Sequence, residues 1–420
     1  MDIFEITGGK KLSGEIRVQG SKNVLFPLLA ATLLTDQECS FTNVPEITDK
    51  EVMVKLLTDL GVEVEAAPHS LKVRATHLMT HELSAEYSSQ LRGSIVLLGG
   101  LLGRLKKASM TFPGGDMIGQ RPIDAHLSAF EKLGAKISVD NTIEIRAEKL
   151  IGNTLVLEES SVTATENIIL ASVLAQGKTI IKLAATEPHV QQLCEFLNLM
   201  GAKISGIGTP TITIEGVASL RGASIELIPD SNEAASFITL AAATKSEVMV
   251  TGINPEYMDD FFLKLRNMNV QFEIGDDFVQ VKTPVGEYSA TKIQCGLYPK
   301  LASDDIPPMA VLATQAEGKS KMNEWMYENR LGYVSELVRM GASAETVDSH
   351  NVIFTGPTNL HGEKITSLDI RMGMTLVVAA LVAEGQSTIE GVEHIDRGYE
   401  KIEERLQKIG ADIKRVTVTL

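Results

Sequence analysis

Residues 51–62 read Glu51-Val52-Met53-Val54-Lys55-Leu56-Leu57-Thr58-Asp59-Leu60-Gly61-Val62, a helical pattern that ends on a glycine and leads into a strand-like alternation. The ending is one of six similar tags whose central residues lie 67 to 73 positions apart. The other tags are Leu133-Gly134-Ala135, Met200-Gly201-Ala202, Met268-Asn269-Val270, Met340-Gly341-Ala342 and Ile409-Gly410-Ala411. A repeated ending at this spacing along the whole chain indicates six copies of one unit.

The tag has a local physical reason. A helix commonly ends on a residue in the left-handed conformation, which glycine adopts freely and asparagine tolerates better than most residues. Five tags carry glycine at the centre and the fourth carries Asn269. Alternation such as Ala202-Lys203-Ile204-Ser205 follows the tag. Each unit is therefore predicted to end as helix, strand, turn, strand.

The front half of each unit contains a second helix of a different kind. These stretches are apolar on every side and rich in Ala and Gly, which predicts helices buried all round and packed closely on their neighbours. They are Leu25–Leu34, Ile95–Gly103, Ile168–Ala175, Phe237–Ala243, Met309–Ala316 and Thr375–Ala383. All are too short to span a bilayer, which needs about 20 apolar residues. We expect interior helices of an α/β protein and no transmembrane segment.

The length of 420 residues exceeds what one hydrophobic core usually supports, so we expect two domains of three units each. The predicted domains are residues 22–229, and residues 1–21 together with 230–420. The opening strands, Phe4–Thr7 and Leu12–Val18, have no unit of their own and are expected to complete the second domain.

Composition excludes several function classes. A formal net charge of −15 argues against general nucleic-acid binding, so any anion site must be locally basic. Cys39, Cys194 and Cys295 are few, far apart and lack metal-ligand spacing, which predicts free thiols in a reducing compartment. The residues after Met1 lack a signal-peptide pattern, and we expect a cytoplasmic protein.

Charged residues gather at two shared positions of the repeat. At the N-termini of buried helices stand Lys22, Arg92, Asp304 and Arg371, which lie 39, 42, 37 and 39 residues before their tags. In the loop before the following helix stand Arg121, Arg330 and Arg397, which lie 13, 11 and 13 residues before theirs. Units three and four are chemically quieter at these positions.

Cations at a helix N-terminus are unfavourable unless an anion or a carboxylate offsets the partial positive charge there. One explanation is that each arginine pairs with a nearby Asp or Glu on a solvated surface. Six basic residues at matching positions favour a second explanation, a multiply charged anionic substrate bound between the two domains.

Five segments resemble one known family, in order from end to end of the chain. They are Gly20-Ser21-Lys22-Asn23, the loop from Pro113-Gly114-Gly115-Asp116 to Arg121-Pro122-Ile123-Asp124, Glu328-Asn329-Arg330, Asp369-Ile370-Arg371, and His394-Ile395-Asp396-Arg397-Gly398-Tyr399-Glu400. The family is that of the UDP-N-acetylglucosamine 1-carboxyvinyltransferases, which are enolpyruvyl transferases. The Pro-Gly-Gly loop and the Asp-Arg-Gly-Tyr-Glu segment are its specific motifs.

The resemblance implies a fold of two inside-out α/β barrel domains, each of three repeats, with the active site in the cleft between them. It implies transfer of the enolpyruvyl group of phosphoenolpyruvate to the 3-hydroxyl of UDP-N-acetylglucosamine, with release of phosphate, at the start of peptidoglycan synthesis. These two small molecules are the expected partners, with no metal, no organic cofactor, no nucleic acid and no membrane. A monomer or weak homo-oligomer is expected.

The resemblance also assigns site residues. Phosphoenolpyruvate is expected to contact Lys22, Asn23, Arg121, Arg330, Arg371 and Arg397, with Lys22, Arg121 and Arg397 on phosphate and Arg330 and Arg371 on the carboxylate. The nucleotide sugar is expected to contact Asn23, Arg92, Arg121, Pro122, Ile123, Asp124, Ala125, Ser161, Val162, Asp304 and Met326. Lys22, Asp116 and Asp304 are the expected catalytic residues, with Asp116 as general acid and Asp304 as base.

Two of these assignments have alternatives. Asp116 stands where the family usually has a cysteine, and it can instead cap or stabilise the loop. Asp304 can instead be an N-cap of the buried helix, and the adjacent Asp305, at a position that is normally apolar, leaves the base uncertain by one residue. His126 is expected to be a structural helix residue.

Three departures from the family concern the acceptor and the base. The Lys-Val-Ser-Val-Gly diphosphate loop reads Glu159-Ser160-Ser161-Val162-Thr163, an arginine common after Pro-Asp is Ser231, and Pro307-Pro308 follows the expected base. They raise two alternatives: a paralogue with another nucleotide or sugar acceptor, and a non-catalytic nucleotide-sugar binding protein. Loss of the loop thiol predicts fosfomycin resistance.

Overall fold

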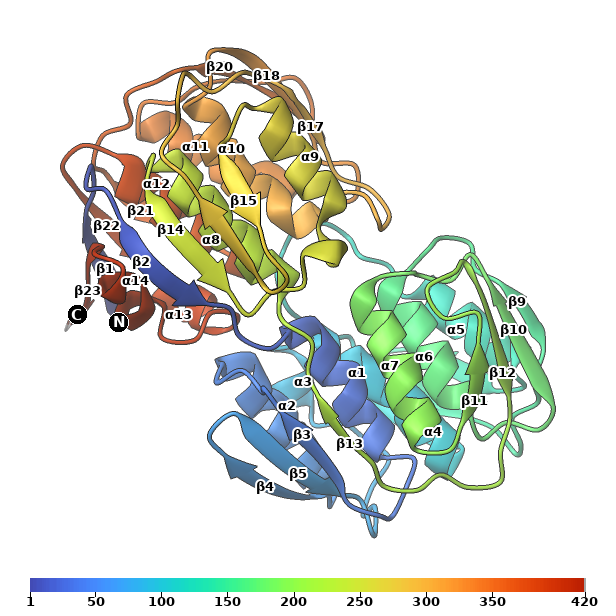
Figure 1. The fold of residues 1–420 in the computed structure, drawn as a ribbon. Helices are drawn as coiled ribbons and strands as arrows, with labels where there is room; N and C mark the ends of the chain where they lie inside the picture. The colour runs from blue at the N-terminus through green and yellow to red at the C-terminus, as the bar shows by residue number, and fades with distance from the viewer. Residues whose placement is uncertain (419–420) are drawn as a thin grey trace. The chain divides into compact units, whose positions relative to one another are not determined.

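Each helix-ending tag adopts the left-handed backbone that its residue type predicts. In the computed structural model, which describes residues 1–418, the central φ angles of the six tags lie between 63° and 104°. Asn269 has the smallest of these angles, and its amide also donates to the carbonyl of Glu287 at 3.2 Å. The predicted repeat of six units is therefore confirmed at the residue that defines it (Figure 1).

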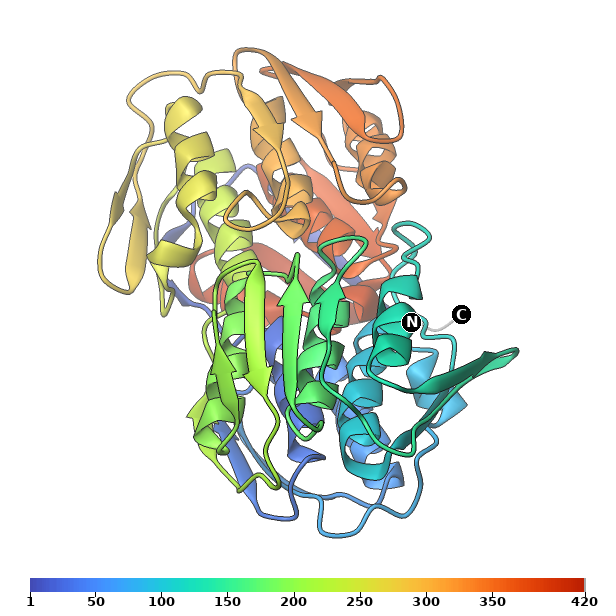
Figure 2. The same cartoon turned by 90° about the vertical axis from the view of Figure 1, so that its right-hand side faces the viewer.

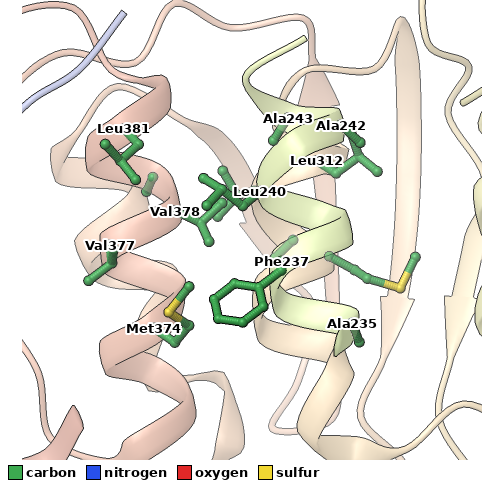
Figure 3. Packing of buried hydrophobic residues seen from close by; sticks show 14 of the residues in the cluster. Ala235, Phe237, Leu240, Ala242, Ala243, Leu312, Met374, Val377, Val378 and Leu381 are labelled. Atoms are coloured by element: carbon green, nitrogen blue, oxygen red, sulfur yellow. The ribbon is translucent and has the colours of Figure 1, made fainter. Parts of the chain in front are cut away.

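One buried helix opens each repeat within residues 1–418, as predicted. These helices are α1 (Lys22–Thr32), α4 (Leu97–Leu105), α6 (Val162–Ser172), α8 (Ser231–Ala243), α10 (Ile306–Thr314) and α12 (Ile370–Val382). Figure 3 shows how two of them meet: Phe237 and Leu240 of α8 point toward Met374 and Val378 of α12. Because almost every side chain of these helices is buried, their apolar composition on all sides is explained.

Small residues let two of these helices approach α4 closely. A side chain at Gly99 would begin 2.5 Å from the backbone oxygen of Asn167, and one at Gly100 would begin 2.6 Å from that of Ala30. No carbon atom fits at such distances, so the glycines of α4 are required by the contacts with α6 and α1.

A second helix precedes each tag. These helices are α2 (Thr48–Asp59), α5 (Asp124–Lys132), α7 (Pro188–Leu199), α9 (Asp259–Asn267), α11 (Tyr333–Arg339) and α14 (Ile402–Lys408). Short helical segments complete the loops: α3 (Ala85–Ser88), α13 (Val392–Asp396), η1 (Arg92–Val96), η2 (Pro255–Tyr257), η3 (Ser303–Asp305) and η4 (Arg330–Gly332). The segments η1 and η3 run directly into the buried helices α4 and α10.

The described strands form one sheet per repeat. In chain order of the repeats, the sheets are β13-β3-β5-β4, β6-β8-β7, β11-β12-β10-β9, β15-β16-β14-β2, β17-β18-β20-β19 and β21-β22-β1-β23. The strands of the first three repeats are β3 (Cys39–Thr42), β4 (Glu63–Ala67), β5 (Ser70–Arg74), β6 (Lys107–Thr111), β7 (Lys136–Val139), β8 (Thr142–Arg146), β9 (Thr154–Val156), β10 (Lys178–Lys182), β11 (Lys203–Ser205), β12 (Thr211–Glu215) and β13 (Ser224–Glu226). Those of the last three are β14 (Glu247–Thr251), β15 (Phe272–Ile274), β16 (Phe278–Val281), β17 (Lys292–Gln294), β18 (Gly318–Asn323), β19 (Ser343–Thr346), β20 (Asn351–Gly356), β21 (Lys364–Thr366), β22 (Gln386–Glu390) and β23 (Asp412–Thr417).

The two opening strands complete sheets of the last three repeats, as predicted. Strand β1 (Asp2–Thr7) lies between β22 and β23 and pairs antiparallel with both, so it supplies the strand that repeat six lacks after its tag. Strand β2 (Ser13–Arg17) pairs parallel with β14 of repeat four. In the first three repeats the corresponding closing strand is β13, which pairs parallel with β3.

The chain forms two compact units. Unit 1 contains residues 1–19, 116–121 and 229–420, and unit 2 contains residues 20–115 and 122–228. Each unit has its own cluster of buried apolar side chains. Strands such as β8 and β12 alternate buried and less buried residues, whereas the six helices that open the repeats are buried along most of their length. In Figure 2 the green strands of β11-β12-β10-β9 lie in front of the helices of their own unit, the inside-out arrangement that was predicted.

Candidate active site

Asp304 lies between two buried arginines in unit 1. Its Oδ1 accepts a hydrogen bond from Nη2 of Arg330 at 2.6 Å, and its Oδ2 accepts one from Nε of Arg371 at 2.8 Å. The Asp304 side chain is 27% exposed, whereas those of Arg330 and Arg371 are 3% and 5% exposed. The first turns of three elements, η3, η4 and α12, therefore bring one carboxylate and two guanidinium groups together.

Burial by itself would lower the pKa of both arginines. The acidic groups and hydrogen-bond partners around them, Asp304 foremost, together outweigh burial and raise the pKa of Arg330 and of Arg371 above the usual value. Arg371 also donates from Nη1 to the hydroxyl of Tyr399 at 3.0 Å, and Nε of Arg330 is buried without a hydrogen-bond partner. Both arginines therefore remain charged in the interior.

Asp305 faces another way. Its Oδ1 accepts a hydrogen bond from the amide of Asn232 on α8 at 2.9 Å. Burial raises the pKa of Asp305 to about 7, although the bond from Asn232 opposes the shift. Asp305, not Asp304, occupies the N-cap position of α10, and its side chain makes no cap hydrogen bond. The alternative that Asp304 is the N-cap of this helix is therefore wrong.

Asp116 pairs with Arg397 across 281 residues of sequence. The distance from Nη1 of Arg397 to Oδ1 of Asp116 is 2.5 Å, and each side chain is 17% exposed. Two further bonds hold the loop: Asn329 N donates to Ile118 O at 3.0 Å, and Gln120 N donates to Oε1 of Glu328 at 2.9 Å. These contacts are the reason that residues 116–121 group with unit 1 although the neighbouring residues of the loop belong to unit 2.

The guanidinium of Arg121 lies 5.9 Å from the ring centroid of Tyr327, and that of Arg330 lies 5.7 Å from the same ring. Tyr327 therefore contributes a cation–π contact to two of the arginines that the sequence singled out.

Unit 2 carries the remaining cations of the pattern. Lys22 is the first residue of α1, and its Nζ lies 3.2 Å from Oδ2 of Asp49, whose side chain is only 3% exposed. Asn23 follows it in the same helical turn. Arg92 is the first residue of η1, packed against Gly115, where a side chain would begin 2.8 Å from Cβ of Arg92.

The predicted placement of the charged residues is thus confirmed. Lys22, Arg92, Asp304 and Arg371 stand in the first turns that open buried helices, and Arg121, Arg330 and Arg397 stand before α5, α11 and α14. Carboxylates do offset several of these cations, as the first explanation required. They do so in buried positions, however, not on a solvated surface.

Six of the residues expected to hold the nucleotide sugar lie at two helix starts of unit 2. Pro122 and Ile123 directly precede α5, which begins at Asp124 and continues with Ala125. Ser161 is the N-cap of α6, with its hydroxyl accepting from Ala164 N at 3.4 Å, and Val162 is the first helical residue. Met326, by contrast, lies in unit 1 beside Tyr327.

His126 is a structural residue, as expected. It is buried, with Nδ1 2.9 Å from the amide of Asn167 and Nε2 3.2 Å from the hydroxyl of Thr163. Burial, with a contribution from the charge of Arg92, lowers its pKa to about 3, so the ring is neutral at physiological pH.

Sequence reasoning missed several residues of this neighbourhood. Asp49, Glu324 and Tyr327 carried no repeat signal, and Asp369 and Tyr399 were quoted only as parts of motifs. Asp369 is the N-cap of α12, and its carboxylate accepts from the backbone N–H groups of Arg371 and Met372 at 2.8 Å. An Asp two residues before Arg371 is a capping signal that sequence inspection could have used.

Three other features bear on earlier expectations. Cys39, Cys194 and Cys295 are free and buried, as predicted. The described residues contain no group of three or more His, Cys, Asp or Glu side chains placed to hold a metal ion. Within residues 1–418, no helix has the length and apolar character needed to cross a membrane.

Comparison with known proteins identifies the family. Residues 6–406 match the family model described as EPSP synthase (3-phosphoshikimate 1-carboxyvinyltransferase). The chain is 39% identical over 425 residues to the UDP-N-acetylglucosamine 1-carboxyvinyltransferase of Borreliella burgdorferi, with 99% of each chain covered. It is 40% identical over 417 residues to the enzyme of that name from Desulforapulum autotrophicum, with 99% of this chain and 100% of the relative covered.

The chain belongs to the UDP-N-acetylglucosamine 1-carboxyvinyltransferase family. It is a transferase of the enolpyruvyl class.

Solved structures agree on the fold. The enolpyruvyl transferase NikO from Streptomyces tendae superposes with a TM-score of 0.90 at 24% identity, covering 100% of this chain and 99% of that chain. EPSP synthase from Acinetobacter baumannii superposes with a TM-score of 0.78 at 20% identity, covering 99% of this chain and 100% of that chain. At these identities the likeness concerns the fold alone, which is the two-domain inside-out α/β fold of the family.

One departure from the 1-carboxyvinyltransferase pattern has a simple structural account. Pro307 and Pro308 lie in the first turn of α10, where backbone N–H groups have no partner within the helix. Proline is tolerated there, and it leaves the segment that bears Asp304 free to contact the arginines.

Proposed function

We propose that this chain transfers the enolpyruvyl group of phosphoenolpyruvate to the 3-hydroxyl of UDP-N-acetylglucosamine with release of phosphate, the first committed step of peptidoglycan synthesis. The observation that carries the proposal is Asp304 held between Arg330 and Arg371, a carboxylate and two charged cations at the positions where the family resemblance requires them. The full-length similarity to enzymes of this name supports the same activity.

Donor binding needs cations for both ends of phosphoenolpyruvate. Arg330 and Arg371 bind its carboxylate, because each is charged, buried and able to donate two parallel hydrogen bonds. The buried, unpartnered Nε of Arg330 supports this role, since an unsatisfied donor costs about 1–3 kcal/mol unless a ligand accepts from it. Lys22, Arg121 and Arg397 bind the phosphate, and Asn23 assists.

Two carboxyl groups move the protons. Asp116, when protonated, gives its proton to the methylene carbon of phosphoenolpyruvate, which makes C2 cationic enough for attack by the sugar hydroxyl. Asp304 takes the proton of that hydroxyl as the C2–O bond forms. Loss of a proton from the new methyl group then expels phosphate and restores the enol double bond, so no redox partner and no cofactor is required.

Asp304 is preferred to Asp305 as the base. Its carboxylate is partly exposed and accepts a hydrogen bond from each of two arginines. Asp305 is buried, faces Asn232 and has a pKa raised by burial to about 7.

The acceptor is bound by Arg92, Arg121, Pro122–Ala125, Ser161, Val162 and Met326, with Asn23 and Asp304. The sequence Glu159-Ser160-Ser161-Val162-Thr163 offers hydroxyl groups and backbone N–H groups to a diphosphate, but no lysine. This departure is the observation that keeps a second candidate, an enolpyruvyl transferase with another nucleotide or sugar acceptor.

Further roles follow from the same proposal. The protein acts in the cytoplasm as a monomer or weak homo-oligomer, and its activity contributes to cell-wall biogenesis, cell shape and division. It resists fosfomycin, because the loop position that carries a thiol in most relatives carries Asp116 here.

A phosphate-release assay with a panel of acceptors tests the proposal. Phosphate release from phosphoenolpyruvate that depends on UDP-N-acetylglucosamine is the expected result. Release only with another nucleotide sugar would favour the second candidate, and binding of nucleotide sugar with no release for any acceptor would favour a non-catalytic binding protein.

A further inference from the structure

The carboxylate of Glu324 is fully buried and accepts four hydrogen bonds. Glu324 directly follows β18 and has no measurable exposure. Its Oε2 accepts from the hydroxyl of Ser303 at 2.8 Å. Its Oε1 accepts from the backbone N–H groups of Met326 at 2.9 Å and Tyr327 at 3.2 Å, and from the thiol of Cys295 at 3.4 Å.

These partners belong to the segments that carry the site. Ser303 is the residue before Asp304, and Tyr327 lies three residues before Arg330 with its ring beneath the Arg330 guanidinium. Glu324 therefore joins the segment of the proposed base to the segment of the arginine that pairs with it.

The backbone of Glu324 is fixed as well. Its N–H donates to the carbonyl of His350 at 2.8 Å, and its carbonyl oxygen lies 2.6 Å from Nδ1 of His350. The backbone of Glu324 is thus held by the residue before β20, and its carboxylate is held by its own following turn and by the segments of Cys295 and Ser303.

A buried carboxylate is costly unless its oxygens accept hydrogen bonds from several donors. All four partners donate a hydrogen bond to Glu324. A carboxylate, which only accepts, matches four donors, whereas a hydroxyl or an amide at this position would bring donors of its own. Its charge also acts on the site: with Asp304 and Asp369, it raises the pKa of Arg330 against the effect of burial. Both the shape and the charge of a glutamate are used at this position.

We propose that Glu324 is a positioning residue for enolpyruvyl transfer, holding the Ser303–Asp304 segment at hydrogen-bonding distance from Arg330. It contacts neither substrate. The inference rests on the proposed function and adds to it a residue that acts through Asp304 and Arg330.

A pair of serine variants tests the proposal. Ser303→Ala removes the hydrogen bond between the Asp304 segment and Glu324. Ser320→Ala is the matched control. Ser320 is a buried serine of β18, the strand that Glu324 follows, and its hydroxyl accepts a hydrogen bond from Thr291 N at 3.3 Å. Each variant loses one buried hydrogen bond, and Ser303→Ala should lose the larger amount of stability because its bond goes to a carboxylate.

Only Ser303→Ala should lose activity. We expect kcat to fall about tenfold, the size of one hydrogen bond to a charged group, while KM for phosphoenolpyruvate changes less than threefold. The kcat–pH profile should move as well. Equal kcat values and unshifted profiles for the two variants would overturn the proposal.

Glu324 itself gives a second comparison. Glu324→Gln keeps the shape, because its amide oxygen can accept from Met326 and Tyr327 and its NH₂ can donate to Ser303. It should retain several-fold more kcat than Glu324→Ala. If Glu324→Ala fails to fold, the serine pair still decides the question.

A stability measurement keeps the inference separate from the proposed function. If the unaltered protein releases no phosphate with any acceptor, the proposed function fails, and unfolding experiments decide the positioning role alone. Asp304→Asn should then destabilise the unaltered protein more than it destabilises the Ser303→Ala variant, because that variant already holds the ion pair loosely. Equal destabilisation in both backgrounds would refute the positioning role.

Discussion

Replacing Asp116 by asparagine should have two opposite effects, a loss of turnover and a gain in anion affinity. Asparagine has nearly the same shape, but it cannot deliver a proton to phosphoenolpyruvate. Because general acid catalysis contributes about 10²- to 10⁴-fold, phosphate release should fall by at least about 100-fold.

The gain in affinity follows from the contact with Arg397. In the structure the Asp116 carboxylate accepts a hydrogen bond from the Arg397 guanidinium, with 2.5 Å between Oδ1 and Nη1, and both side chains are 17% exposed. This guanidinium is the group that is proposed to bind the phosphate of the donor. A phosphate must displace that carboxylate. A charge-assisted hydrogen bond contributes about 1.5–3 kcal/mol, and the neutral asparagine retains roughly half of it. About 1.4 kcal/mol of competition is thus removed, which corresponds to about tenfold tighter binding.

Two assays measure the two effects. Phosphate release in the presence of UDP-N-acetylglucosamine gives turnover, and isothermal titration calorimetry with phosphoenolpyruvate or inorganic phosphate gives affinity. Glu328→Gln is the matched control, because Glu328 also holds the loop, through Gln120 N, whereas Arg397 donates to Asp116. Turnover of Asp116→Asn within tenfold of the unaltered protein would remove Asp116 as the acid, and unchanged affinity would refute the competition for Arg397.

Three other perturbations have defined outcomes. Fosfomycin should cause no time-dependent inactivation and no added mass on the intact protein, because Asp116 replaces the loop thiol. The three cysteines of the chain are also unreactive, since burial raises the pKa of Cys39 and raises the pKa of Cys194 and of Cys295 to about 12. A stable adduct would contradict this prediction. Asp305 has a folded-state pKa of about 7, above its ordinary value, so its contribution to the free energy of unfolding is present at low pH and is lost as pH rises from about 4 to 7. Urea unfolding at pH 5 and pH 8 should show this loss of stability in the unaltered protein but not in Asp305→Asn. An identical pH dependence in both proteins would exclude a contribution from Asp305. Gly410→Ala should lower the free energy of unfolding by about 1 kcal/mol because of the φ of 97° alone, since no other atom lies within 4 Å of the new Cβ. Gly341→Ala should cost more, because its new Cβ would lie 3.0 Å from the backbone oxygen of Asn359. Equal denaturant midpoints for the two variants would show that this contact is relieved without cost.

Much of the fold was predictable because it depends on local rules repeated six times. A left-handed residue at Gly61 or Asn269 follows from helix termination, and an interior helix at Phe237–Ala243 follows from its composition. The place of β1 and β2 followed from counting, since two strands without a unit had to complete sheets that lacked one.

The pairing within the site was less predictable, because it depends on how repeats pack on one another. Periodicity brought Lys22, Arg371 and Arg397 to the right ends of their helices, but it did not indicate which carboxylate would face each cation. The contacts to Asp49 and Asp116 depend on packing between segments that lie 27 and 281 residues apart in the chain. Tyr327 and Glu324 escaped notice because a buried aromatic ring and a buried acid at a strand end have no signature in one sequence.

The most direct test of enolpyruvyl transfer is the rate of phosphate release from phosphoenolpyruvate with and without UDP-N-acetylglucosamine, with the sugar product identified by mass spectrometry. The account predicts release only in the presence of the acceptor, one phosphate for each enolpyruvyl sugar formed, and loss of both products in Asp304→Asn. Absence of phosphate with this acceptor, or full activity of Asp304→Asn, would contradict it.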